Sequence, residues 1–250
     1  MDIKSLKIMS LACALAYSSS GYSNSLFPNS VASNDIDFIL ATDPSVLAKL
    51  EFVGNSRQEL ADKRTDVLFD DNAYVFHASY ADDTSIKIFA SSAFINLEEA
   101  TRYAEMLLKP VGKLPFKMRE KLAYIVVLKG NETAFAEDKG HFFAVYSKNM
   151  DIRSGNNDLE ETVFHESVHA TLDESYSNSE RWLSAQQSDN IFITNYAERN
   201  PRKEDLAESA LFTYTYLRNP DRLPPHVKIW LEKMMPNRLA FFEKLFQDQY

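Results

Sequence analysis

The pentapeptide His165-Glu166-Ser167-Val168-His169 restricts the local fold more than any other feature of this chain. Residues four positions apart lie on the same face of an α-helix, so the two imidazoles can converge on one metal ion when this segment is helical. Glu166 would then stand beside the ion as a general base, in a site where zinc makes hydroxide available near neutral pH. The motif therefore predicts a helix with two zinc ligands, His165 and His169, and a catalytic carboxylate.

The residues around the pentapeptide favour such a helix. Asn157 can cap its first turn, and Glu160, three residues later, completes a capping box. Neither Gly nor Pro interrupts residues 158–174. Apolar side chains recur at helical spacings, at Leu159, Val163, Phe164, Val168 and Leu172. We therefore expect the motif in the middle of a largely buried helix.

A zinc site of this kind needs a third protein ligand. The metzincin pattern is excluded, because it requires a Gly and a third His at fixed offsets and the chain has neither there. A downstream helix, with Asn200 as its cap and Pro201 at its first position, would place Glu204 and Glu208 on one face. We assign Glu204 as the metal ligand and Glu208 as the hydrogen-bond partner of a ligating imidazole. The reverse assignment and a merely solvated acidic face are the alternatives.

In these two segments the chain resembles the gluzincin metallopeptidases, in particular the anthrax lethal factor type, whose third ligand lies in an acidic, alanine-containing segment shortly after a tyrosine. The residues 204–208, Glu-Asp-Leu-Ala-Glu, follow Tyr196 in that way, with a one-residue insertion. From about Ala41 to Phe242 the chain is also similar to uncharacterised secreted bacterial and fungal proteins predicted to be zinc peptidases. The shared stretches are Leu159–Glu166, Phe192–Ala197 and Pro236–Arg238. The resemblance implies a zincin-like fold, one zinc ion per chain and the ligands His165, His169 and Glu204.

Two more side chains are candidates for the site. By the same resemblance, Tyr196 would donate a hydrogen bond to the oxyanion that forms when a carbonyl is attacked, and loss of such a donor typically costs about a hundredfold or more in rate. The alternative is that Tyr196 only packs beneath the helix. Asp173, one turn after His169, is either a partner of a ligating imidazole or simply a polar residue at the helix end.

Residues 1–21 have the pattern of a secretory signal peptide. Lys4 and Lys7 precede an apolar run over residues 8–17, which is too short for a stable membrane span and is followed by Ser-Ser-Ser-Gly. We expect cleavage within residues 16–23 and a secreted or periplasmic protein, with an amphipathic helix as the alternative. Cys13, the sole cysteine, lies too close to Lys7 for a lipoprotein signal. The mature chain would then have neither disulfides nor a thiolate metal site.

Composition excludes several other classes of function. The formal net charge of -9 argues against a nucleic-acid partner. The chain has six glycines and no Gly-rich phosphate loop, so nucleotide binding has no support. Residues 22–250 suit one domain with a substantial core, since no repeat or low-complexity linker divides them.

The remaining patterns predict an α+β fold, with a mixed-sheet lobe over about residues 60–175 and an all-helical lobe over about 176–250. Alternation predicts a hairpin of residues 74–80 and 86–88, and Asn96 with Glu99 predicts a helix through Leu108. Apolar runs predict strands at 124–128 and 142–146. Further helices are expected near 180–188, 202–217, 225–234 and 238–246. The metal would lie in a cleft between the lobes, where strand 142–146, if it is an edge, could pair with an extended peptide.

Two functions fit these features. The first is a secreted zinc metallopeptidase that acts on a peptide or protein substrate, with Glu166 as general base. The second is a non-catalytic zincin-like protein that binds zinc for stability or serves in interactions at the cell surface. Loss of hydrolysis in a Glu166→Gln variant that keeps its zinc would separate the first from the second.

Overall fold

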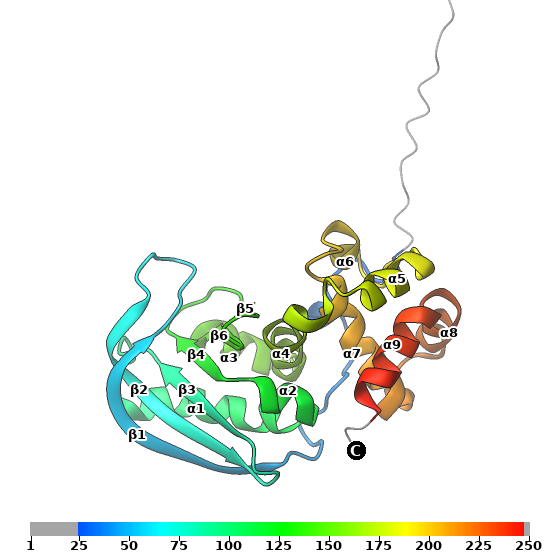
Figure 1. The fold of residues 1–250 in the computed structure, drawn as a ribbon. Coiled ribbons are helices and arrows are strands. Elements are labelled where there is room, and N and C mark those ends of the chain that lie inside the picture. The colour runs from blue at the N-terminus through cyan, green and yellow to red at the C-terminus, as the bar shows by residue number, and fades with distance from the viewer. Residues whose placement is uncertain (1–24, 248–250) are drawn as a thin grey trace, which may run out of the picture.

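The computed structural model describes residues 25–247 and is drawn in Figure 1. In this part of the chain, six strands form one mixed sheet and helices pack beside it, so the predicted α+β class is confirmed. The predicted signal peptide, residues 1–21 with Cys13, lies outside the described residues. No helix within residues 25–247 has the length and apolarity needed to cross a membrane.

The sheet has the strand order β1-β2-β3-β4-β6-β5. β1, β2 and β3 are joined in antiparallel fashion, β4 and β6 continue the sheet in parallel, and β5 returns antiparallel to β6. The strands are β1 (Leu47–Glu59), β2 (Phe69–Tyr80), β3 (Ser85–Ala90), β4 (Tyr124–Leu128), β5 (Phe135–Glu137) and β6 (Phe142–Tyr146). The predicted hairpin is confirmed as β2 and β3. β4 and β6 are buried almost throughout, as expected of central strands.

The helices are α1 (Leu97–Gly112), α2 (Phe116–Lys121), α3 (Ser147–Gly155), α4 (Leu159–Tyr176), α5 (Glu180–Asp189), α6 (Asn195–Arg199), α7 (Asp205–Arg218), α8 (Pro225–Met234) and α9 (Pro236–Phe246), with short 3-10 turns η1 (Val31–Ser33) and η2 (Pro220–Arg222). α4 lies between the sheet and the group α5–α9 (Figure 1) and packs on elements of both. One hydrophobic cluster runs from β2 and β3 through α4 to α9. The two sides of the molecule therefore share a core, which fixes the position of α4.

One prediction about the sheet is wrong, and one alternative that the sequence left open is decided by the strand order. The sheet lobe begins at Leu47, because β1 precedes the expected start near residue 60. The pairing of β1 with β2 has three irregularities, which interrupt the alternation of side chains along β1. A search for period-two alternation therefore did not indicate this strand. Residues 142–146 are an interior strand, since β5 pairs with the outer side of β6 and takes the edge position. β5 spans only three residues, too few for alternation to indicate a strand.

The helix that carries the acidic pair also begins later than expected. Asn200 does not cap it: its backbone N–H bonds to the carbonyls of Tyr196 and Ala197 and so closes α6. Residues 201–204 form a turn, and α7 begins at Asp205 with Glu204 in the capping position. The reason is that α6 forms directly before the expected cap, with Thr194 accepting a hydrogen bond from the N–H of Ala197 at its start.

Candidate metal centre

The pentapeptide occupies the middle of α4, where both histidines point to the same side. The Nε2 atoms of His165 and His169 are 3.1 Å apart. Buried apolar residues anchor the helix on its other sides: Leu159, Val163, Phe164, Val168 and Leu172. Packing rather than a capping box stabilises its start. Asn157 adopts a left-handed φ of 61° and lies outside the helix, so the predicted cap at Asn157 is wrong.

Glu204 supplies the third donor atom. Its Oε2 lies 3.4 Å from the Nε2 of His165 and 3.3 Å from the Nε2 of His169. Within residues 25–247, these three side chains form the group of possible metal ligands whose donor atoms all lie within 4.8 Å of one another. Ligands around a tetrahedral zinc ion, with bonds of about 2.0–2.1 Å, stand about 3.3 Å apart. The edges of this triangle, 3.1 to 3.4 Å, are compatible with the donor spacing around a tetrahedral metal ion.

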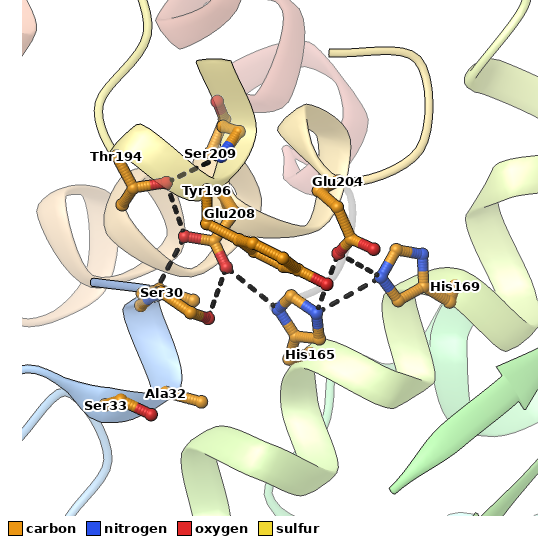
Figure 2. A network of polar contacts seen from close by, with 12 residues as sticks. Ser30, Ala32, Ser33, His165, His169, Thr194, Tyr196, Glu204, Glu208 and Ser209 are labelled. Carbon is orange, nitrogen blue, oxygen red and sulfur yellow. Dashed lines mark hydrogen bonds and ion pairs between the residues drawn. The ribbon is translucent and has the colours of Figure 1, made fainter. Parts of the chain in front are cut away.

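Glu208 lies on the opposite side of the His165 ring from Glu204. Its Oε1 is 3.6 Å from the Nδ1 of His165, while Glu204 faces Nε2 of the same ring. Glu204, in the capping position of α7, and Glu208, in its first turn, thus lie on opposite sides of the His165 ring (Figure 2). Glu204 is therefore positioned to share a metal ion with the two Nε2 atoms, and Glu208 is positioned to bind the Nδ1 of His165. The reverse assignment does not fit these positions.

Asp173 contacts the second imidazole. Its Oδ2 lies 2.7 Å from the Nδ1 of His169, which leaves Nε2 of that ring directed at His165 and Glu204. A carboxylate on the rear nitrogen fixes the orientation and tautomer of a ligating histidine. Of the two interpretations of Asp173, the structure supports the partner of an imidazole. The contact follows from the four-residue spacing on one helix.

The charges of the cluster are strongly coupled. Burial alone would raise the pKa of Glu204, but hydrogen bonds from His165 and His169 outweigh burial and hold its pKa well below the usual range. Burial would lower the pKa of His169, yet its hydrogen bonds to Asp173 and Glu204 raise that pKa well above its ordinary value. The carboxylates therefore favour positive charge between the two rings, whether it is carried by a proton or by a metal ion.

A cavity of about 470 Å³ opens beside the three donor atoms. Glu166 and Tyr196 line it together with β5 and the turn that precedes Glu204. Shielding from solvent raises the pKa of Glu166, which improves it as a base. Burial, followed by the negative charge of Glu204, raises the pKa of Tyr196, so its hydroxyl remains a donor. Figure 2 shows the Tyr196 ring directed towards His165 and Glu204, so it does not pack beneath the helix.

Reasoning from the sequence missed part of this centre. Ser30, Val31 and Thr194 all donate hydrogen bonds to the carboxylate of Glu208. Ser30 and Val31 come from a segment without any recognisable motif, and Thr194 lies in the stretch Phe192–Ala197 but was not singled out. The signal that could have indicated Thr194 is its capping position before α6. His141 directly precedes β6, but its Nδ1 is hydrogen-bonded to the carbonyl of Ala170, and it is not among the donors.

The centre is thus defined by its geometry: a triangle of two imidazoles and a carboxylate, a further carboxylate behind each ring, and an adjoining cavity with Glu166 and Tyr196 in its wall. Both sides of the shared core contribute to it, since β5 belongs to the sheet and α6 and α7 to the helical group. No family model matches the chain, and no curated protein or solved structure matches it either.

Proposed function

We propose that this protein is a secreted zinc-dependent metallopeptidase of the zincin-like, gluzincin type, with one zinc ion held by His165, His169 and Glu204. The observation that carries the proposal is the triangle of donor atoms, with edges of 3.1 to 3.4 Å, beside the carboxylate of Glu166 in the wall of a cavity. Two imidazoles with one carboxylate are a ligand set of catalytic zinc, and such sites leave a coordination position open. Secretion is proposed from the sequence of residues 1–21.

Each side chain of the centre has a part in this chemistry. When bound, zinc would act as a Lewis acid and lower the pKa of water in the cavity. Glu166 takes the proton of the attacking water and returns it to the leaving amine. Tyr196 donates a hydrogen bond to the oxyanion that develops on the attacked carbonyl. Asp173 and Glu208 hold the two imidazoles in position from behind.

The edge strand β5 supports a peptide as the substrate. Its residues, Phe135–Glu137, line the same cavity as Glu166, and β5 pairs with a neighbouring strand on one side only. An edge strand presents unpaired backbone groups, with which an extended peptide can form main-chain hydrogen bonds. Peptide pairing was conditional on an edge strand, and β5, not residues 142–146, holds the edge position next to the three donor residues.

The proposal is tested first by the metal content of purified protein. We expect one zinc per wild-type chain and little or no zinc in His169→Ala and Glu204→Ala, because each removes one of three ligands. Elemental analysis after dialysis gives the stoichiometry, and circular dichroism shows whether the variants fold. His226→Ala is the matched control, since this exposed histidine lies outside the donor group and its loss leaves zinc unchanged.

Two results would count against the proposal in different ways. A wild-type chain that binds no zinc, even after reconstitution, contradicts the metal centre. Stoichiometric zinc without turnover of a broad peptide library favours the non-catalytic zinc-binding protein.

A further inference from the structure

The carboxylate of Glu208 is completely buried and is held by an unusually full set of partners. The hydroxyl of Ser30 donates to its Oε1 at 2.5 Å. The backbone N–H of Val31 and the hydroxyl of Thr194 both donate to Oε2 at 2.8 Å. Figure 2 shows Glu208 between Ser30 and Thr194 on one side and the His165 ring on the other. The two carboxylate oxygens thus have separate partners: Oε2 is fixed by two donors, and Oε1 meets Ser30 and His165.

The donors on Glu208 come largely from a remote part of the sequence. Ser30 lies 178 residues before Glu208 and belongs to the extended segment that leads into η1. This segment is held in place by Phe27, whose backbone N–H and C=O bond to Ile193 and Asn195 on the stretch just before α6. The Phe27 ring also stacks on Phe212 of α7. The segment is therefore docked independently of its contact with Glu208.

The rear nitrogen of His165 needs an acceptor. Nδ1 is buried and has no hydrogen-bond partner within the described residues, and Oε1 of Glu208 lies 3.6 Å away. An imidazole that binds zinc through Nε2 carries its proton on Nδ1, and that proton is normally donated to a carboxylate or carbonyl. Oε1 can serve only if the carboxylate keeps its present orientation. Val31 and Thr194 hold the other oxygen, and Ser30 is the side chain bonded to the oxygen that faces the ring.

We propose that Ser30 is a positioning residue of the metal centre, which acts through Glu208 on His165. The inference rests on the proposed zinc site. It makes the segment before η1 a functional part of a centre whose ligands all lie more than a hundred residues later in the chain. Zinc affinity should therefore depend on the Ser30 hydroxyl, although that hydroxyl bonds to Glu208 and not to one of the three ligands.

The test measures the zinc dissociation constant of the full chain by competition with a chromophoric chelator. Loss of a carboxylate behind a ligating histidine typically weakens metal affinity about 10–100-fold, and we expect Glu208→Gln in that range. Ser30→Ala should weaken affinity by about tenfold, and Ser30→Thr, which keeps the hydroxyl, should restore it. Ser33→Ala is the matched control, because its hydroxyl contacts Arg153 and not Glu208.

A double variant separates positioning from general damage. If Ser30 acts through Glu208, Ser30→Ala combined with Glu208→Gln binds zinc no more weakly than Glu208→Gln alone. Additive losses, or wild-type affinity in Ser30→Ala, overturn the inference. Thermal unfolding in excess chelator checks that the variants fold, and Ser30→Cys replaces Ser30→Ala in the cycle if the latter does not. A wild-type chain without zinc overturns the proposed centre itself, and this inference with it.

Discussion

Glu166→Gln is expected to lower peptide hydrolysis by roughly 10²–10⁴-fold while the zinc content stays at the wild-type level. Glu166 lines the cavity beside the three donor atoms but is not one of them, so its amide analogue leaves the ligand set intact. The amide cannot accept the proton of the attacking water, and the general base is lost. The size and shape of the side chain are retained, which confines the change to the proton transfer.

The measurement compares initial rates of wild type and variant on the same peptide library, with zinc determined on the same samples. Glu174→Gln is the matched control, because Glu174 is exposed on the same helix and faces His141 instead of the donor group. Its activity should equal that of the wild type. Undiminished hydrolysis by Glu166→Gln would show that another group acts as the base.

Arg238→Met is expected to lower the free energy of unfolding by about 3–5 kcal/mol, since removal of one partner leaves a buried charge uncompensated. The side chains of Arg238, Asp189 and Asp205 are all completely buried. The guanidinium donates two bonds to Asp205, at 2.7 and 2.9 Å, and one to Asp189 at 3.0 Å. Methionine fills much of the volume but leaves both carboxylates without their cation.

The loss is measured by urea unfolding followed by circular dichroism, with chelator present so that zinc does not contribute. Arg57→Met provides the comparison, because Arg57 pairs with Asp71 at the surface, where ion pairs contribute little. Equal effects of the two substitutions would contradict the structural role of Arg238. Asp205 directly follows Glu204, so Arg238→Met should also weaken zinc binding, as the start of α7 loses its anchor.

Several features of this protein could be predicted from short stretches of sequence, because local backbone and side-chain geometry determines them. A run of residues 158–174 without Gly or Pro, with apolar side chains at helical spacing, corresponds to α4. The four-residue spacing of His165, His169 and Asp173 follows from the helical repeat and accounts for their contacts. The apolar run at β4 likewise indicated a central strand, because its side chains are buried on both faces.

Local signals failed where two neighbouring segments competed for the same residue. Asn200 has the side chain of a helix cap, but it ends α6 instead, because α6 forms directly before it and uses its backbone N–H. Asn157 resembles a cap in the same way, yet its left-handed backbone serves the turn between α3 and α4. Asn is suited both to a helix cap and to a left-handed turn or a helix end. The packing of the adjacent helices therefore decides which of these roles each Asn takes.

The sequence by itself determined the helix that carries His165, Glu166 and His169 and narrowed the third donor to an acidic pair. Only the tertiary structure decided that Glu204 faces both Nε2 atoms and that Glu208 lies behind His165. It also decided that Ser30 bonds to Glu208, which is 178 residues away in the sequence. The helical repeat places residues three or four positions apart on one face, so it can be recognised from the order of residues in the sequence. The contacts of Ser30 and Glu204 depend instead on how the shared core brings α4, α7 and the segment before η1 together, and no local pattern encodes that arrangement.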